Sequence, residues 1–479
     1  MNPAVIAELK TIVAPGYVHT APSEIIAYSY DGTFQQHRPD LAVSPASTAE
    51  VAAVMRLAAR TEIPIIARGA SSGLAGGTIP ESGGIVLNLA RMDSIVEIDT
   101  ANVCVVAQAG VVTLQLQQAV ERLGLFYPPD PASSRQSTIG GNVATNAGGP
   151  RCLKYGATRD YVIGLTVVLA SGEVLRLGGK FTKSATGYQL MQLFVGSEGT
   201  LGIVTEVIMR LLPLPRARVT AVAIFDRLAL ASQAVSTIMG SGILPATLEL
   251  MDGTTINVVE DYLQAGLPRH AQALLLLEQD GADEAVARAE VERMAEICRT
   301  LGAERVQVAA SAAERDGLWQ ARRSVSAALG RLRPNKLGED IVVPKSEIPA
   351  MIAAVGEIAA TYGLPIPVFG HAGDGNLHPN ILFDLRDPAE VQRVEHAARD
   401  IFRAALRLGG TLSGEHGVGT LKREFLEEAQ GPLAVSLARA VKHAFDPRGL
   451  LNPGKVFPTG RGTVGFLSDL PTLSGWTPG

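Results

Sequence analysis

Arg68-Gly-Ala-Ser-Ser-Gly-Leu-Ala-Gly-Gly77 is the stretch that decides the fold. Four of its ten residues are glycine and two are serine, a composition that lets several backbone amides converge on an anion. The stretch follows Pro64-Ile-Ile-Ala67, whose apolar run predicts a buried strand. It contains no GxGxxG pattern and no helix start, which argues against a Rossmann site. Taken alone, it is also compatible with an ordinary glycine-rich loop.

Two further segments of the first half have the same character. Residues 128–149 are rich in proline, serine and glycine and are too long for a simple connection. Residues 196–206 form a third glycine-rich loop that leads into a strand. Upstream of all three, Ser47-Thr-Ala-Glu50 is a capping box, and it predicts a helix that buries Val51, Val54, Met55 and Ala58. The first half is therefore expected to present several flexible loops to one ligand.

Bulk properties limit the classes of protein to consider. A chain of 479 residues is long enough for two or three domains. The formal net charge of −5 argues against a nucleic-acid-binding protein. No apolar run approaches the roughly 18 residues of a membrane span, and the N-terminus lacks a secretory signal. Cys104, Cys152 and Cys298 are far apart, which favours a reducing compartment and excludes a built-in iron–sulfur cluster. A cytoplasmic protein is expected.

The second half predicts an α+β domain. Residues 218–310 alternate short strands with helical stretches, the pattern of an antiparallel sheet with covering helices. Ser311-Ala-Ala-Glu314 is a second capping box, and the helix it begins carries Trp319, Arg322 and Ser326 on one face. An arginine there could bind a carboxylate through two hydrogen bonds. A surface arginine that only packs its aliphatic stem is the alternative.

Two histidine-containing segments suggest a catalytic centre. His371-Ala-Gly-Asp-Gly-Asn-Leu-His378 and Ser413-Gly-Glu-His-Gly-Val-Gly419 contain three of the eight histidines. Each histidine taken singly fits a structural role, but two histidines and a carboxylate flanked by glycines fit a His₂Glu metal site. Glu415 and His416 are neighbours, so their side chains point to opposite sides of an extended segment. We assign Glu415 to the metal and His416 to proton transfer, and the reverse assignment stays open.

The three loops of the first half, in this order, resemble the FAD-binding domain of the vanillyl-alcohol-oxidase/p-cresol-methylhydroxylase superfamily over about residues 38–215. The resemblance implies an FAD site that the structure should place along these loops. It also implies non-covalent FAD, because Ala70, Ser71 and Ser72 stand where some members carry a flavin-linked histidine. The implied cofactor-binding residues of this half are Arg68, Gly69, Ala70, Ser71, Ser72, Gly73, Leu74, Gly76, Gly77, Pro131, Thr138, Gly141, Asn142, Asn146, Gly148, Gly202 and Ile203.

The second half resembles the C-terminal domain of FAD-linked D-2-hydroxy-acid dehydrogenases. His-x-Gly-Asp-Gly-Asn-x-His and Glu-His-Gly-x-Gly carry this resemblance. It implies His371, His378 and Glu415 as metal ligands and His416 as catalytic base. The further residues that it implies are Arg322 as a catalytic and substrate-binding residue, Ser326, Lys336 and Asn380 as substrate-binding residues, and Asn376 and Asn452 as cofactor-binding residues. The spacing from Lys336 to Asp340 differs from the hydroxyglutarate enzyme, which argues against a dicarboxylate substrate.

Together the resemblances imply an α+β fold class, with a p-cresol-methylhydroxylase-type FAD-binding domain and a ferredoxin-like FAD-linked oxidase C-terminal domain. The expected boundaries are 1–215 for the FAD-binding domain, 216–440 for the substrate and metal domain, 441–460 for a segment that returns to the FAD domain, and 461–479 for a flexible tail. The metal would be zinc or manganese, with iron as a further candidate. A homodimer is the default expectation for the assembly.

The implied function is oxidation of a small 2-hydroxy acid, D-lactate or glycolate, to the 2-oxo acid. Electrons would pass to a separate acceptor: a cytochrome, an electron-transfer flavoprotein or an iron–sulfur subunit. That partner could also attach the protein to the periphery of a membrane. The alternatives are D-2-hydroxyglutarate dehydrogenase, a flavin transferase similar to alkyl-dihydroxyacetonephosphate synthase, a metal-dependent hydrolase, and a flavoprotein subunit that only relays electrons.

Overall fold

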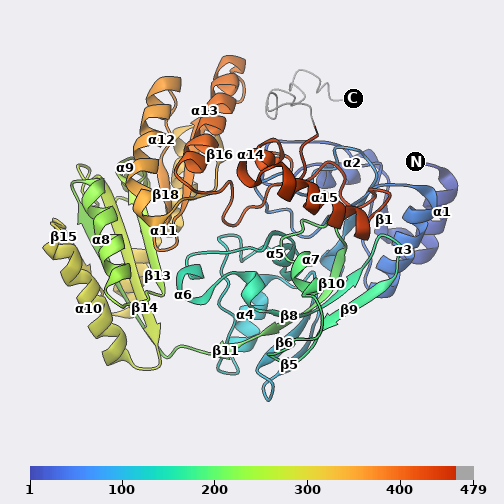
Figure 1. Cartoon of the computed structure of the whole chain (residues 1–479), viewed down its shortest axis with the longest axis horizontal. Helices are drawn as coiled ribbons and strands as arrows, with labels where there is room; N and C mark the ends of the chain where they lie inside the picture. Colours follow the sequence, from blue (N-terminus) through green and yellow to red (C-terminus); the bar gives the residue numbers. More distant parts are fainter. Residues whose placement is uncertain (460–479) are drawn as a thin grey trace. The chain divides into compact units, whose positions relative to one another are not determined.

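Two units make up the part of the chain that the computed structural model describes, residues 1–459. The first contains residues 1–148, 157–214 and 415–459, and the second contains residues 149–156 and 215–414 (Figure 1). Residues 149–156, which were expected in the first domain, pack with the second unit because Lys154 and Tyr155 both hydrogen-bond to Asp280. Residues 415–440, expected in the second domain, pack with the first. The tail expected over 461–479 lies outside the described residues.

The first unit has two main sheets. In the smaller, of order β1-β2-β4-β3, the central strands run parallel. The larger, of order β5-β6-β10-β8-β9, is antiparallel throughout. A two-stranded ladder joins β7 and β11. The strands are β1 (Val18–His19), β2 (Leu41–Val43), β3 (Ile65–Arg68), β4 (Ile85–Asn88), β5 (Ile95–Asp99), β6 (Cys104–Gln108), β7 (Leu125–Phe126), β8 (Val162–Val168), β9 (Val174–Gly178), β10 (Ile203–Arg210) and β11 (Leu212–Pro213).

Helix α3 (Thr48–Thr61) confirms the first predicted capping box. The Ser47 hydroxyl accepts a hydrogen bond from the Glu50 amide, and the Glu50 carboxylate accepts one from the Ala46 amide. The apolar face predicted for this helix is buried in the core between the helix and the smaller sheet. The other helices of this unit are α1 (Pro3–Ile12), α2 (Pro22–Ile25), α4 (Thr113–Glu121), α5 (Ile139–Thr145), α7 (Leu190–Phe194), α14 (Leu426–Gln430) and α15 (Pro432–Phe445).

One sheet of order β15-β12-β14-β13-β18-β19-β16 organises the second unit, and β17 also pairs with β19. Every pairing in it is antiparallel, which confirms the predicted α+β class and sheet type. The strands are β12 (Ala217–Phe225), β13 (Thr247–Asp252), β14 (Ala273–Gly281), β15 (Arg305–Val308), β16 (Asn335–Gly338), β17 (Ile341–Val342), β18 (Val368–His371) and β19 (Asn376–Phe383).

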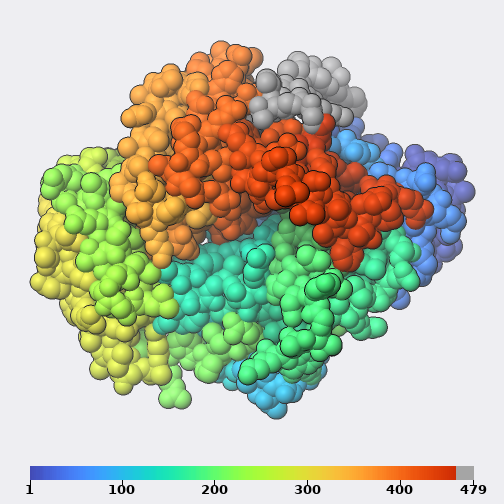
Figure 2. All heavy atoms as spheres, in the orientation of Figure 1, coloured from blue at the N-terminus to red at the C-terminus, as the bar shows by residue number. Residues whose placement is uncertain are grey.

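Helices cover this sheet. Helices α9 and α11 bury apolar side chains against Val222, Ile224 and Leu276. Helices α8 and α10 contact β12 and β14, and they form the green-to-yellow surface of the second unit at the left of Figure 2. The helices of this unit are α6 (Cys152–Tyr155), α8 (Leu228–Gly240), α9 (Gly253–Leu263), α10 (Glu284–Thr300), α11 (Ala312–Leu332), α12 (Ile348–Tyr362) and α13 (Pro388–Arg407). Among the described residues, no helix combines the length and apolarity needed to cross a membrane.

Candidate active site

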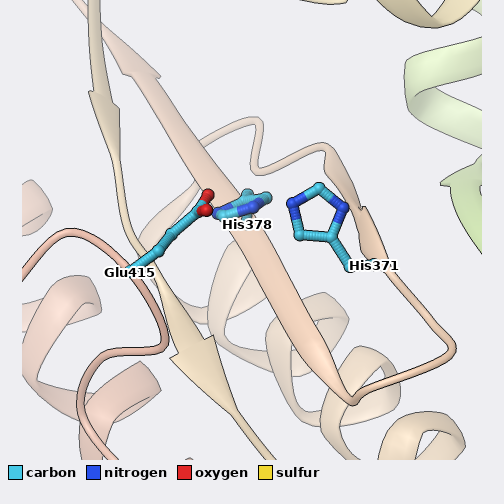
Figure 3. Close-up of side chains that lie close together, drawn as sticks. All are labelled: His371, His378 and Glu415. Carbon is cyan, nitrogen blue, oxygen red and sulfur yellow. The ribbon is translucent and has the colours of Figure 1, made fainter. Parts of the chain in front are cut away.

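The hairpin of β18 and β19 positions two of the three predicted metal ligands. His371 ends β18, a four-residue turn follows, and His378 lies in β19 opposite Phe369. The two imidazole rings are edge-to-face with centroids 5.2 Å apart, and both are buried. Ligand atoms of His371, His378 and Glu415 all lie within 4.8 Å of one another, and Figure 3 shows the side chains pointing toward a common point. The three predicted ligands are thus brought close together, and two imidazoles with one carboxylate are a donor set that suits a divalent cation.

Asp340 fixes the backbone that presents Glu415. Its buried carboxylate accepts hydrogen bonds from the Ser413 hydroxyl and the Gly414 amide, directly before Glu415. It also accepts one from the side-chain amide of Asn376, 2.6 Å away. The Asn376 amide, which was predicted to approach a flavin, also donates to the carbonyl of Ile341. Asn376 and the Gly414 backbone thus share Asp340 as their acceptor.

Glu249 joins the metal-ligand set to Arg322. Strand β13 pairs with β18 so that Glu249 lies directly opposite His371, and one carboxylate oxygen contacts His371 Nδ1. The other oxygen accepts a hydrogen bond from Arg322 Nε at 2.6 Å. Burial raises the pKa of Glu249, but the charges and hydrogen bonds of His371 and Arg322 outweigh it and lower the pKa below its ordinary value. Sequence reasoning missed this residue; the only signal was an acidic residue inside an apolar strand.

The other predicted substrate residues lie on the same face of the sheet. The Arg322 guanidinium also stacks on Phe369, 4.6 Å from the ring centroid. Lys336, on β16, donates to the Ser326 hydroxyl at 2.8 Å, and burial lowers its pKa. Asn380 is buried opposite Gly338, and its side-chain amide donates to the carbonyl of His378. Asn380 and Arg322 are thus tied to the two histidines, through the carbonyl of His378 and through Glu249, while Lys336 and Ser326 pair with each other.

A pocket within the first unit brings the three glycine-rich segments together. The predicted cofactor residues that line it are Arg68, Gly69, Ala70, Ser71, Ser72, Gly73, Leu74, Gly77, Pro131, Thr138, Gly141, Asn142, Gly148 and Gly202. Glu415 and His416 also line it. Lining residues that the sequence analysis did not single out include Ser133, Ser137, Ser197, Glu198 and Gly199. All five lie inside the quoted glycine-rich segments, so their composition was the available signal.

Four predicted cofactor residues of this unit do not line the pocket. Gly76 packs against Thr420, where an added Cβ would lie 2.0 Å from the hydroxyl oxygen. Asn146 ends α5 and accepts a hydrogen bond from the Arg159 amide. Ile203 belongs to the buried core beside the smaller sheet. Asn452 donates to the carbonyls of Gly77 and Glu198, and so holds two lining loops together.

The first loop of the pocket fits a phosphate-containing ligand. The backbone amides of residues 70–74 donate no hydrogen bond to any group within residues 1–459. All five residues line the pocket. Unpaired amides beside a pocket are donors for an anion. Gly69 lets this loop approach α5, because a Cβ there would lie 2.4 Å from the Thr138 hydroxyl oxygen. The Arg68 guanidinium points away from the loop, donating to the carbonyls of Tyr30 and Ala27.

Two protein-family models match the chain. The model "FAD linked oxidases, C-terminal domain" matches residues 214–456, and the model "FAD binding domain" matches residues 39–178. Glycolate oxidase subunit GlcD of Bacillus subtilis is 49% identical over 433 residues, which cover 90% of this chain and 92% of the relative. The Escherichia coli protein of the same name is 40% identical, with coverage of 92% and 88%. A D-lactate dehydrogenase of Archaeoglobus fulgidus is 36% identical, with coverage of 90% and 95%.

Solved structures show the same fold at low sequence identity. Substrate-bound p-cresol methylhydroxylase superposes with a TM-score of 0.79 at 17% identity, covering 95% of this chain and 96% of its own. Alkyldihydroxyacetonephosphate synthase superposes with a TM-score of 0.74 at 20% identity, covering 95% and 86%. These likenesses extend to the fold alone.

Proposed function

Because the chain belongs to the family of FAD-linked oxidases and is an FAD-dependent 2-hydroxy-acid dehydrogenase, we propose that its substrate is D-lactate or glycolate. A divalent metal at His371, His378 and Glu415 would orient this substrate. His416 would be the base that takes its hydroxyl proton. The observation that carries the proposal is the assembly of these three ligands beside Arg322. Relatives named as a glycolate oxidase subunit and as D-lactate dehydrogenases support the choice of acid.

The chain's residues would hold FAD without a covalent bond. The amides of residues 70–74 would bind its phosphates, and the segments around Thr138 and Gly202 would enclose the rest. Bound FAD supplies the two-electron redox chemistry that no side chain can provide. Three separated cysteines are too few for a protein-bound iron–sulfur cluster, so the electrons leave to a separate acceptor.

The metal would be held by two imidazoles and one carboxylate, a set that accepts zinc, manganese or iron. Its charge would lower the pKa of the substrate hydroxyl. Glu249 engages Nδ1 of His371, so Nε2 would be the ring nitrogen that binds the metal. Arg322 uses Nε for Glu249, and its two terminal nitrogens would bind the substrate carboxylate. His416 takes the hydroxyl proton, because histidine is the side chain that most often serves as a general base.

Lys336 favours one alternative substrate, a 2-hydroxy acid with a second carboxylate. Partial burial lowers the pKa of its ammonium, which donates to the Ser326 hydroxyl. A distal carboxylate would give this ammonium an ionic partner on the same face as Arg322. D-2-Hydroxyglutarate is the acid of this type to include in a substrate test.

The test mixes the FAD-loaded protein, without oxygen, with D-lactate, L-lactate, glycolate and both enantiomers of 2-hydroxyglutarate, and follows bleaching of the flavin band. Fast bleaching by D-lactate or glycolate is the expected result. Bleaching only by D-2-hydroxyglutarate would replace the proposed substrate with the alternative. Fast bleaching by L-lactate would refute the proposed stereochemistry.

The role of His416 is tested by His416→Gln in the same experiment. Loss of a general base typically costs 10²- to 10⁴-fold, so flavin reduction should slow by about that factor while FAD stays bound. Reduction at the wild-type rate would show that another group takes the proton.

A further inference from the structure

Glu198 connects the FAD pocket to the segment that carries His416. It lies in the third glycine-rich loop, lines the pocket, and is 8% exposed. Its backbone has a φ of +52°, which few residues other than glycine adopt. Each carboxylate oxygen accepts one backbone hydrogen bond of 2.8 Å, from the amides of Val418 and Gly419. A single buried side chain therefore binds two successive amides that begin two residues after His416.

The segment after His416 is held to the pocket walls on its other side as well. The Thr420 amide donates to the carbonyl of Ala75 in the first loop at 2.9 Å. Gly419 allows this approach, because a Cβ there would lie 1.9 Å from the same carbonyl oxygen. Gly417, at φ +86°, would place a Cβ 2.9 Å from the Glu198 carboxylate. Residues 417–420 are thus packed against two of the three loops that line the pocket.

We propose that Glu198 is a positioning residue for proton transfer: it fixes the His416 backbone to the wall of the FAD pocket, so that the imidazole is held at a defined place relative to the flavin. The inference rests on the proposed role of His416 as base. A carboxylate is costly to bury, and here its hydrogen-bonding capacity is directed at the segment that carries the base. Because catalytic groups must be placed to within a fraction of an ångström, a loosened segment slows the reaction without releasing the substrate.

Glu198→Gln tests the proposal. Glutamine keeps one acceptor oxygen and turns an NH₂ group toward the other amide, so one of the two hydrogen bonds is lost. We expect FAD content and the apparent substrate Kd to stay within about twofold of wild type, and flavin reduction at saturating substrate to slow by about 10- to 100-fold. The proposal would be overturned if the variant reduced its flavin at the wild-type rate. It would also be overturned if loss of FAD alone accounted for the lost activity.

Glu260→Gln is the matched control. Glu260 also accepts hydrogen bonds from two successive amides, those of Gly266 and Leu267, but the segment that it holds carries no site residue. Its substitution removes the same kind of contact and should leave flavin reduction unchanged. If Glu260→Gln slows reduction as much as Glu198→Gln does, the effect is not specific to the His416 segment.

A double-mutant cycle with His416→Gln separates the two proposals. If Glu198 acts through His416, the double variant should reduce its flavin no more slowly than His416→Gln alone. If the fold-losses in rate of the two single variants multiply in the double variant, the inference is refuted and His416 remains the base. If His416→Gln reduces its flavin at the wild-type rate, the proposed function on which the inference rests is refuted instead.

Gly417→Ala is a second variant in case Glu198→Gln does not fold. The added methyl group presses on the same carboxylate from the side of the segment and also strains the backbone at φ +86°, without changing a residue that lines the pocket. It should also slow reduction with FAD retained, and its effect should vanish in the His416→Gln background. A full-speed Gly417→Ala variant would count against the proposal.

Discussion

Glu249 engages Nδ1 of His371, so the proposed metal would bind the other ring nitrogen. This partner selects the imidazole tautomer and fixes the plane of the ring. The same carboxylate holds Arg322, so one residue orients both the proposed metal ligand His371 and the proposed substrate-binding cation. Glu249 is 1% exposed, and no other described residue joins these two side chains.

Glu249→Gln should weaken metal binding by about 10- to 100-fold, the usual cost of removing such a partner. One glutamine oxygen can serve only one of the two donors, and its NH₂ group faces the other. Metal content and titration of metal-depleted protein would measure the change, with FAD content unaffected.

Glu278→Gln is the control for this experiment. Glu278 is an equally buried carboxylate of the same sheet, but it accepts hydrogen bonds from Thr220 and Trp319. It should keep wild-type metal affinity. Equal losses in the two variants would mean that any buried carboxylate of the sheet supports the metal, and Glu249 would have no special role.

Helix α11 illustrates how an element sorts neighbouring residues into different roles. Arg322 and Arg323 are adjacent, and a helix turns its side chains apart by about 100° per residue. Arg322 faces the sheet, with a side chain 14% exposed against Glu249. Arg323 is exposed and lies over the Trp319 ring. The spacing of Trp319, Arg322 and Ser326 predicted that Arg322, and not Arg323, lies on their shared face, and Arg322 does face the sheet.

Arg322→Lys should raise the substrate KM by about 10- to 100-fold, because a lysine cannot reproduce paired hydrogen bonds to a carboxylate. Arg323→Lys keeps the same charge and should leave KM unchanged. Initial rates with an artificial electron acceptor over a range of D-lactate or glycolate concentrations would measure both. An unchanged KM in Arg322→Lys would remove this residue from substrate binding.

At the scale of the whole molecule, the chain after residue 414 returns to the first unit and packs against its hydrophobic core. Lys455 ends this return, is 3% exposed, and donates to the carbonyl of Ile79 at 2.6 Å. Burial lowers the pKa of Lys455 to about 8, and the nearby Glu81 opposes the shift only partly. The structure therefore retains an ammonium whose charged form is less stable in the folded protein than in the unfolded chain.

This shift predicts a pH dependence of stability. Between pH 8 and the unfolded lysine pKa of about 10.4, the unfolded chain binds more protons at this position than the folded protein. The contribution of Lys455 to stability should therefore rise with pH, on the order of 2 kcal/mol over this range. Thermal unfolding of wild type and Lys455→Met at pH 7 and pH 9.5 measures it. The difference in Tm should move in favour of wild type at the higher pH; an unchanged difference would show an ordinary lysine pKa.

Local sequence determined the helices, strands and glycine-rich loops, because capping, side-chain periodicity and backbone freedom act over a few residues. The three glycine-rich segments also contain most of the residues that line the pocket, and the three proposed metal ligands lie within or beside the short histidine motifs. Only the tertiary structure decided which side chains reach a site and which support it. Glu249 meets His371 through strands 122 residues apart, Asp340 holds Gly414 from 74 residues away, and Glu198 binds Val418 from 220 residues away. Such contacts depend on strand register and on which distant segments pack together, and a local sequence pattern specifies neither.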